Sequence, residues 1–303
     1  MLNTPVLFLI FNRPDTTQQV FAKIREAQPK QLFVAADGPR ADRENEDNLC
    51  RETRAIIEQV DWDCEVKTLF RAENLGCGKA VYSAINWFFE NVEYGIILED
   101  DCLPNTTFFS FCETLLKHYQ DDDKIMHISG SSFLFGKIAG DGSYYFSKFA
   151  RIWGWATWRS AWRQVDFELK NLDNFLLQEK NITDYWKNNL IKTKSHQIDT
   201  WDFQWIFTLW LRGGKAITPN VSLVKNIGYN ENATHTFKPH WWKSRIKYGL
   251  INTIKHPTTT EIDKDADRFS DKIISNIPLT TIERIKMRMN VFLFDFIYKQ
   301  DYL

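Results

Sequence analysis

Short apolar runs alternate with polar, helix-like segments along the first hundred residues of the chain. Four of these runs predict strands, over residues 6–11, 31–36, 64–70 and 94–98. The segments between them repeat apolar residues with helical spacing, over 15–27, up to about residue 60, and over 79–91. Strands and helices in alternation, joined by short turns, predict right-handed βαβ units and a mostly parallel, doubly wound sheet.

A polar or glycine-bearing turn follows each of the four apolar runs. In chain order these turns are Asn12-Arg13, Asp37-Gly38, Asn74-Leu75-Gly76 and Glu99-Asp100-Asp101. Turns that follow parallel strands lie at the carboxyl edge of the sheet, where open α/β sheets bind their ligands. We therefore expect the four turns to border one crevice.

The pattern becomes less regular after residue 123. The predicted elements are a strand over 125–129, helices over about 171–194 and 200–212, and short strands near 215–219 and 222–226. An aromatic run occupies 153–158. The segment 282–294 is a basic amphipathic helix, which either docks on the core of the protein or contacts anionic lipid.

Composition excludes some classes of protein. The net charge of −1 over 303 residues gives no reason to expect a nucleic-acid partner. The five cysteines form no C-x-x-C pair, which indicates reduced thiols inside a cell. No apolar run has the length of a membrane span, and the N-terminus lacks the pattern of a signal peptide. We therefore expect a cytoplasmic protein, soluble or peripheral at the inner face of the membrane.

The acidic triplet Glu99-Asp100-Asp101 is the strongest candidate for chemistry. Three adjacent carboxylates at the end of a buried strand repel one another unless a cation compensates them. Mg²⁺ and Mn²⁺ take oxygen ligands and are often held by one or two carboxylates together with substrate phosphates. The alternative is a solvated acidic turn, which the apolar strand before the triplet disfavours.

Two other turns offer groups that bind nucleotides. Asp37 supplies a carboxylate for a base N–H and Arg40 a guanidinium for a phosphate, although the same residues also suit a plain β-turn. The segment from Asn74 to Lys79 resembles a glycine-rich loop that enters a helix N-terminus, which favours phosphate. It matches neither the Walker A pattern nor G-x-G-x-x-G.

Three more polar residues are candidates further along the chain. Asp199 and Asp202 stand among aromatic residues at the start of a predicted helix, where each suits either a helix N-terminus or a general base. His235 lies in a polar segment and is a metal ligand, a phosphate contact or a surface histidine.

Taken together, these segments resemble the GT-A superfamily of nucleotide-sugar glycosyltransferases, and more closely bacterial relatives of the N-acetylglucosaminyltransferase that begins complex N-glycans. The residues that carry the resemblance are Phe11-Asn12-Arg13-Pro14, Ala36-Asp37-Gly38-Pro39-Arg40, Glu73-Asn74-Leu75-Gly76, Leu98-Glu99-Asp100-Asp101, Trp153-Gly154-Trp155-Ala156-Thr157-Trp158 and Asp199-Thr200-Trp201-Asp202. The resemblance implies a Rossmann-like, mostly parallel sheet flanked by helices, with a helix-rich C-terminal part. It divides the chain into a domain over 1–240, with a nucleotide-binding half (1–105) and an acceptor-binding half (106–240), and a C-terminal extension over 241–303.

The resemblance also implies a role for each matched residue. Asp101 would meet the metal and Asp100 the ribose and the metal; His235, which the resemblance does not match, is the further candidate for the metal. Asp37 would contact uracil. The other donor-binding candidates are Asn12, Arg13, Arg40, Asn74, Lys79 and Glu99, and the acceptor wall would comprise Trp153, Trp155, Trp158 and Trp201. The relatives carry Trp-Asp-Asp with the second acid as the base. This chain reads Trp201-Asp202-Phe203, which assigns the base to Asp202 with Asp199 as the alternative.

The implied activity is Mn²⁺- or Mg²⁺-dependent transfer of a hexosyl or N-acetylhexosaminyl group from a nucleotide-diphosphate sugar, a UDP-sugar by resemblance. Transfer would invert C1 and serve bacterial surface glycan synthesis, with a glycan or lipid-linked acceptor. Two rivals stay open. A nucleotidyltransferase would carry a glycine-rich, basic loop after the first strand, where this chain has Phe11-Asn12-Arg13-Pro14. A non-catalytic carbohydrate-binding protein would leave the acidic triplet without a purpose.

Overall fold

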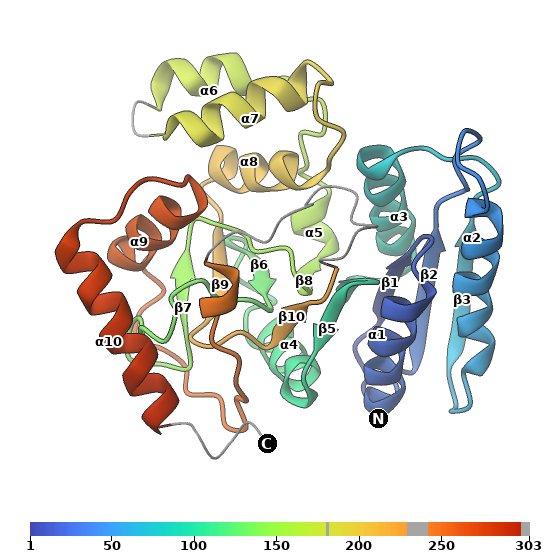
Figure 1. Ribbon diagram of the computed structural model, residues 1–303, viewed down its shortest axis with the longest axis horizontal. Coiled ribbons are helices and arrows are strands. Elements are labelled where there is room, and N and C mark those ends of the chain that lie inside the picture. The colour runs from blue at the N-terminus through green and yellow to red at the C-terminus, as the bar shows by residue number, and fades with distance from the viewer. Residues whose placement is uncertain (180–181, 229–241, 298–303) are drawn as a thin grey trace.

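An eight-stranded sheet runs through the middle of the protein, with helices on both faces (Figure 1). The computed structural model describes residues 1–179, 182–228 and 242–297. The strands of the sheet are β1 (Val6–Ile10), β2 (Gln31–Ala36), β3 (Glu65–Phe70), β4 (Tyr94–Glu99), β6 (Ile125–Ser129), β7 (Tyr144–Ser147), β8 (Trp155–Trp158) and β9 (Lys215–Pro219). Their order across the sheet is β3-β2-β1-β4-β8-β6-β9-β7. A two-stranded ribbon pairs β5 (Cys102–Pro104) with β10 (Val224–Asn226).

The helices are distributed along the whole chain. They are α1 (Pro14–Ala27), α2 (Glu46–Ala55), α3 (Cys77–Asn91), α4 (Thr106–His118), α5 (Arg159–Trp162), α6 (Leu172–Gln178), α7 (Asp184–Lys194), α8 (Asp202–Arg212), α9 (Lys264–Ile274) and α10 (Thr281–Ile297), with short 3-10 turns η1 (Ile56–Gln59) and η2 (Lys243–Arg245). The helical pattern predicted over 171–194 is interrupted and forms α6 and α7. Three helices, α4, α5 and α9, were not predicted.

The first four strands of the sheet follow the hydrophobic pattern closely. β3, β2, β1 and β4 are all parallel, with Val6 opposite both Leu32 and Ile96 in the register. Every residue of β1 is buried because helices cover both faces of the sheet there. The predicted mixed α/β fold with a mostly parallel sheet is therefore confirmed.

The second half of the sheet matches the prediction in β6 and β9 but differs from it in β7 and β8. The aromatic run at 153–158 contains a strand, β8, which inserts between β4 and β6 and is antiparallel to both. β6 and β9 are parallel, whereas β7 and β9 are antiparallel. The pattern did not predict β8 because a strand in the centre of a sheet needs no alternation of polar and apolar residues.

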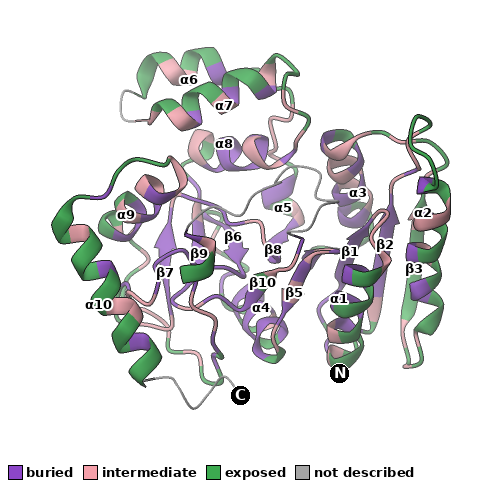
Figure 2. Ribbon diagram, in the orientation of Figure 1, coloured by how far each residue is buried: buried purple, intermediate pink, exposed green. Residues whose placement is uncertain are grey.

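Two hydrophobic clusters cover the two faces of the sheet. One packs α1 and α4 against the sheet through residues such as Phe8 and Phe108. The other packs α3, α5 and α8 through residues such as Phe33, Trp155 and Trp205. Figure 2 shows the resulting division, with buried strands in the middle and exposed outer faces on the helices.

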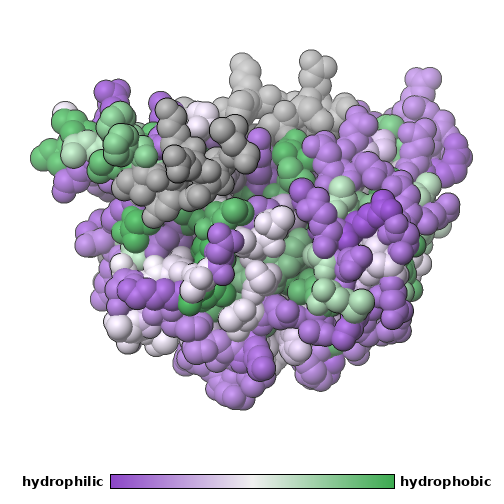
Figure 3. Space-filling view, turned by 90° about the horizontal axis from the view of Figure 1, so that it is seen from below, coloured by the Kyte–Doolittle hydropathy of each residue, from purple (hydrophilic) through white to green (hydrophobic). Residues whose placement is uncertain are grey.

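The C-terminal helices α9 and α10 pack beside the second half of the sheet (Figure 1). The predicted boundary between residues 240 and 241 lies outside the described residues. In Figure 3, hydrophobic side chains gather at the left edge of the molecule, which is the side of α10 in Figure 1. Among the described helices, none has the length and hydrophobicity needed to cross a membrane.

Candidate active site

A cavity of about 730 Å³ opens at the carboxyl edge of the parallel strands, opposite the start of α8. All four predicted turns line it, through Arg13, Asp37, Asn74, Gly76, Glu99, Asp100 and Asp101. Asp199 and Asp202 line it from the side of α8. Its volume is that of a site for a small molecule. The expectation that the four turns border one crevice is therefore confirmed.

The guanidinium of Arg13 lies between the last two acids of the triplet. Its Nη1 donates to Oδ2 of Asp101 at 3.0 Å, and its Nη2 donates to Oδ1 of Asp100. The Sγ of Cys102 lies 3.4 Å from Oδ1 of Asp101 and donates to it. Arg13 therefore connects the turn after β1 to the turn after β4, and it provides a positive charge beside the triplet.

Three carboxylates and one guanidinium still leave this end of the cavity with surplus negative charge. Burial raises the pKa of Glu99 above its ordinary value, and the charges of Asp101 and Asp100 raise it further. Burial also raises the pKa of Asp100, against the opposing effect of Arg13. Both shifts have the same cause, since buried like charges resist ionisation together. An additional cation would lower both pKa values.

The donor set suits a hard divalent cation that is completed by its substrate. Among the described residues, no group of three or more His, Cys, Asp or Glu side chains is arranged to hold a metal ion. Mg²⁺ needs only one or two protein carboxylates when phosphate oxygens fill the remaining positions. Asp101 and Asp100 fit this requirement. His235, the third predicted ligand, lies outside the described residues.

Asp37, after β2, is fixed in the cavity by backbone groups of the next turn. Its carboxylate accepts from the N–H of Leu75 at 3.0 Å and from the N–H of Gly76 at 3.1 Å. Burial raises the pKa of Asp37, and the hydrogen bond from Leu75 opposes that shift. Arg71, which directly follows β3, also lines the cavity, and burial lowers its pKa. Arg71 and Asp37 thus place one positive and one negative group in the part of the cavity next to β2 and β3.

The N-terminus of α3 is occupied by carboxylates of the chain itself. Besides the bonds to Asp37, the N–H of Gly78 donates to Oδ1 of Asp199 at 2.9 Å. A Cβ on Gly76 would lie 2.5 Å from Oδ2 of Asp199, so this close approach requires glycine. A helix N-terminus attracts anions, and here two aspartates supply them. The structure therefore does not support a phosphate site on the loop from Asn74 to Lys79.

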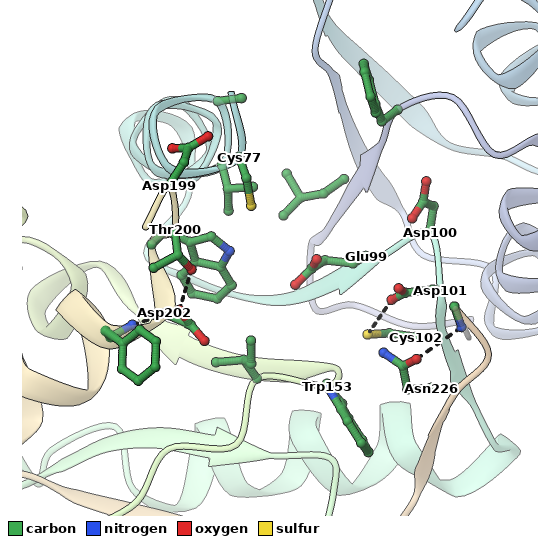
Figure 4. Close-up of a pocket in the computed structure, with 18 of the residues that line it drawn as sticks. Cys77, Glu99, Asp100, Asp101, Cys102, Trp153, Asp199, Thr200, Asp202 and Asn226 are labelled. Atoms are coloured by element: carbon green, nitrogen blue, oxygen red, sulfur yellow. Dashed lines mark hydrogen bonds between the residues drawn. The ribbon is translucent and has the colours of Figure 1, made fainter. Parts of the chain in front are cut away.

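Asp199 and Asp202 take different positions although they are three residues apart. α8 begins at Asp202 and its N-cap is Trp201, so Asp199 caps α3 and not α8. Oδ1 of Asp202 accepts from Oγ1 of Thr200 and from the N–H of Phe203. Figure 4 shows the carboxylates of Asp202 and Glu99 directed into the cavity from opposite sides, with Asp199 beside a helix farther away.

Aromatic rings form the wall of the cavity nearest the C-terminal part. Trp153 and Trp242 stack with their ring centroids 6.2 Å apart, and Phe133 meets the edge of Trp153 at 5.1 Å. The Nζ of Lys243 lies 5.9 Å from the ring centroid of Trp153, and burial lowers the pKa of this lysine to about 8. Of the predicted acceptor residues, Trp153 and Trp201 line the cavity.

Trp155 and Trp158 do not line the cavity, which corrects the predicted acceptor wall. Both belong to β8 and are buried in the two core clusters, on opposite faces of the sheet. The Nε1 of Trp158 donates to the carbonyl of Leu116 at 3.2 Å. Alternation along a strand explains the split, since neighbouring side chains in a sheet point to opposite faces.

Of three further predicted donor-binding residues, only Arg40 lines the cavity. Asn12 donates to Oε1 of Glu46 at 2.9 Å and does not line the cavity. Arg40 lines the cavity, but its Nε donates to Oε2 of the same Glu46 at 3.0 Å. Lys79 is exposed and lies outside the cavity. Glu46 therefore binds both Asn12, a predicted donor-binding residue, and Arg40, which was expected to reach a phosphate.

Several lining residues were missed by the sequence analysis. They are Arg71, Arg151, Tyr185, Asn189, Asn226, Trp242 and Lys243. Arg71 directly follows a predicted strand, so its position was a usable signal. Trp242 and Lys243 belong to a run of aromatic and basic residues, which was a weaker one. Tyr185 and Asn189 reach the cavity only because α7 packs on α8, which no local pattern indicates.

No protein family matches the chain, and no curated protein matches it in sequence. Similar folds occur among solved structures. The apo form of a UDP-glucose pyrophosphorylase is 12% identical, over 72% of this chain and 90% of that one, with a TM-score of 0.38. An inositol-1-phosphate CTP transferase from T. maritima is 8% identical over 72% and 86%, with a TM-score of 0.36. HddC from Yersinia pseudotuberculosis is 10% identical over 52% and 77%, with a TM-score of 0.33. Similarity at this level assigns no role to any residue.

Proposed function

We propose that the protein transfers a sugar from a nucleotide-diphosphate sugar to a hydroxyl acceptor, in a reaction that depends on Mn²⁺ or Mg²⁺. The observation that supports this most directly is the placement of carboxylates across one cavity. Asp100 and Asp101 stand on one side with Arg13, and Asp202 stands on the other. Glycosyl transfer needs both kinds of group, since charge develops on the leaving diphosphate and a proton leaves the acceptor hydroxyl.

On the donor side, Asp37 and Arg71 would contact the base, and Asp100 would contact the ribose. Asp101, with Asp100, would hold the divalent cation, whose positive charge stabilises a diphosphate leaving group when it is bound. Arg13 would hold the two acids in place through its hydrogen bonds. The backbone at Gly228 approaches Asp101 so closely that only glycine fits there, because a Cβ would lie 2.2 Å from Oδ2 of Asp101.

On the acceptor side, Asp202 would accept the proton of the attacking hydroxyl. Its bonds from Thr200 and from the backbone of Phe203 both use Oδ1 and fix the orientation of the carboxylate. Trp153, which is half-buried, would provide a flat surface for a sugar ring, and the buried Trp242 would support it from behind. We propose inversion at C1, a hexosyl or N-acetylhexosaminyl donor, and a role in bacterial surface glycan synthesis on the basis of the sequence resemblance.

Donor binding and turnover test this proposal. Thermal shift with Mn²⁺ and a panel of nucleotide sugars identifies the donor, and release of nucleoside diphosphate then measures turnover. We expect Asp101→Asn to lose turnover and Mn²⁺ dependence. Asp173→Asn is a matched control, because Asp173 is 79% exposed on α6 and does not line the cavity. Equal turnover of Asp101→Asn and the wild type would contradict the metal site.

A second candidate is nucleotidyl transfer, the activity named for several of the similar structures. It would use the same cavity, since a nucleoside triphosphate also brings a base, a ribose and phosphates to the carboxylates. The products separate the two reactions. Nucleotidyl transfer breaks the bond between the α- and β-phosphates and releases pyrophosphate, whereas glycosyl transfer breaks the bond between C1 and the diphosphate. Pyrophosphate release from a nucleoside triphosphate and a sugar phosphate would favour the second candidate.

A further inference from the structure

The C-terminal helix α10 has two hydrophobic faces, and only one of them is buried. On the buried face, Met287 packs into a cluster with Phe133 and Trp242, and Phe294 is buried beside Gly136. A second set, which we call the α10 stripe, is between 47% and 75% exposed and consists of Ile282, Ile285, Met289, Phe292, Leu293 and Phe296. These positions recur every three or four residues, so they share one side of the helix. A surface helix ordinarily carries polar residues there.

The charges on α10 favour a negatively charged partner. Its two acids are paired with lysines from other segments: Glu283 lies 2.7 Å from the Nζ of Lys272, and Asp295 lies 2.6 Å from the Nζ of Lys247. The basic residues of the helix are exposed, and they are Arg284, Lys286 and Arg288. The α10 stripe is therefore bordered by positive charges, and the two acids of the helix are already paired with lysines of other segments.

We propose that α10 lies in the surface of an anionic lipid bilayer, with the α10 stripe in the acyl–headgroup boundary and its basic residues at the headgroups. Charge complementarity argues for this partner over a second copy of the chain, because two such stripes facing each other would bring their cations together. Exposed phenylalanines with flanking Lys and Arg are the composition of helices that bind in the plane of a membrane. In Figure 3 this edge of the molecule carries the gathered hydrophobic side chains described above.

The buried face of α10 connects the stripe to the cavity. A Cβ on Gly136 would lie 2.8 Å from Cβ of Phe294, so the helix packs directly on the segment that contains Phe133. Phe133 and Trp242 line the cavity and belong to the same cluster as Met287. A membrane at the α10 stripe would therefore lie near the aromatic wall. This consequence rests on the proposed function and points to a lipid-linked acceptor.

Vesicle sedimentation of the full chain tests the membrane contact without any substrate. Vesicles of phosphatidylcholine with phosphatidylglycerol should pull down the protein, and vesicles of phosphatidylcholine alone should bind it at least tenfold more weakly. Replacing Lys286 and Arg288 by Gln should weaken binding about fivefold for each charge lost, and added salt should reduce the difference. Because turnover of a nucleotide sugar is measured without vesicles, failure of one proposal leaves the other intact.

The hydrophobic part of the contact has a matched control in the chain. Phe292→Ser with Phe296→Ser should reduce vesicle binding at least tenfold, whereas Leu177→Ser should not change it, although Leu177 is 78% exposed on α6. Circular dichroism verifies that each variant is folded. Absence of binding to anionic vesicles, equal binding of the double variant, or a dimer in ultracentrifugation that the double variant abolishes would each overturn the proposal.

Discussion

The two halves of the sheet contribute different chemistry to the same cavity. In the parallel half, formed by β3, β2, β1 and β4, the residues directly after the strands supply the charged groups, among them Arg13, Asp37 and Asp101. In the other half, formed by β8, β6, β9 and β7, the longer connections supply Phe133, Trp153 and the start of α8. The parallel half provides its charged groups by local geometry, whereas the other half provides the aromatic wall and the acids Asp199 and Asp202 by packing.

This difference implies that the hydrophobic core of the second half positions Asp202, the candidate for the proton acceptor. Trp155 of β8 stacks on Trp201 with ring centroids 5.5 Å apart, and Trp201 immediately precedes Asp202. Trp205, one turn into α8, packs on the same ring at 5.8 Å. The acid at the start of α8 therefore depends on a tryptophan cluster, whereas Arg13 and Asp101 depend on the turns after β1 and β4.

The largest effect we expect on stability comes from that cluster. Trp155→Ala removes a completely buried side chain, and we expect the free energy of unfolding to fall by about 4 kcal/mol. Trp153→Ala, at the cavity wall, should cost clearly less because Trp153 is only half-buried. Urea unfolding of both variants measures the contrast. Equal losses would show that the two tryptophans do not divide into a core residue and a wall residue.

The second-largest effect we expect is a loss of turnover on replacing Asp202. Asp202→Asn keeps the shape of the side chain but removes the proton acceptor, so we expect turnover to fall about a hundredfold to a thousandfold. Binding of UDP should be retained, because the groups assigned to the nucleotide come from the parallel half. Steady-state kinetics and calorimetric titration with UDP test the two statements separately. Loss of UDP binding or unchanged transfer would contradict the assignment.

The parallel half was predictable because each of its elements is specified locally. The strand predicted over 31–36 is β2 without any shift, and that over 94–98 is one residue shorter than β4. In the second half, β6 and β9 also match the strands predicted over 125–129 and 215–219, but β7 and β8 were not predicted as strands. Its central strand β8 is entirely buried, so residues 155–158 show no polar alternation and were interpreted as a binding surface.

A smaller effect, on how the free energy of unfolding depends on pH, also tests the buried core of the second half. His127 in β6 is buried against Trp155, and its Nδ1 accepts from Nε1 of Trp205 at 3.0 Å. Its Nε2 lies 3.1 Å from the carbonyl of Arg151 and donates to it, which fixes a neutral tautomer. Burial lowers the pKa of His127 from 6.5 to about 3. Between pH 6.5 and about pH 3, His127 therefore binds a proton in the unfolded chain but not in the folded protein.

The stabilising contribution of neutral His127 is complete above pH 6.5 and is lost as the pH falls toward 3. The slope is about 1.4 kcal/mol for each pH unit, or about 2 kcal/mol between pH 6.5 and pH 5. Urea unfolding of the wild type and of His127→Gln at pH 7 and pH 5 measures it, since the variant lacks this slope whatever its absolute stability. The same loss in both proteins would place the titration elsewhere.

The sequence predicted several residues of the site but not the hydrogen bonds between them. Arg13, Asp37 and the triplet could be named because they follow predicted strands. That Arg13 bonds to Asp100 and Asp101, or that Asp37 bonds to the amides of Leu75 and Gly76, depends on distances between separate turns. Such contacts require the register of neighbouring strands, which one sequence does not contain.

The smallest effect concerns Asp199, an acid beside α8 that bonds to the parallel half. Its Oδ1 accepts from the N–H of Gly78 at the start of α3. Asp199→Asn retains an oxygen for this bond and loses only the interaction of a charge with the helix dipole, so we expect a loss of roughly 0.5 kcal/mol in thermal or urea unfolding. Turnover should stay within about twofold of the wild type, because the carboxylate caps a helix. If turnover instead fell as far as in Asp202→Asn, the proton acceptor would be Asp199, and the two halves would share the catalytic step.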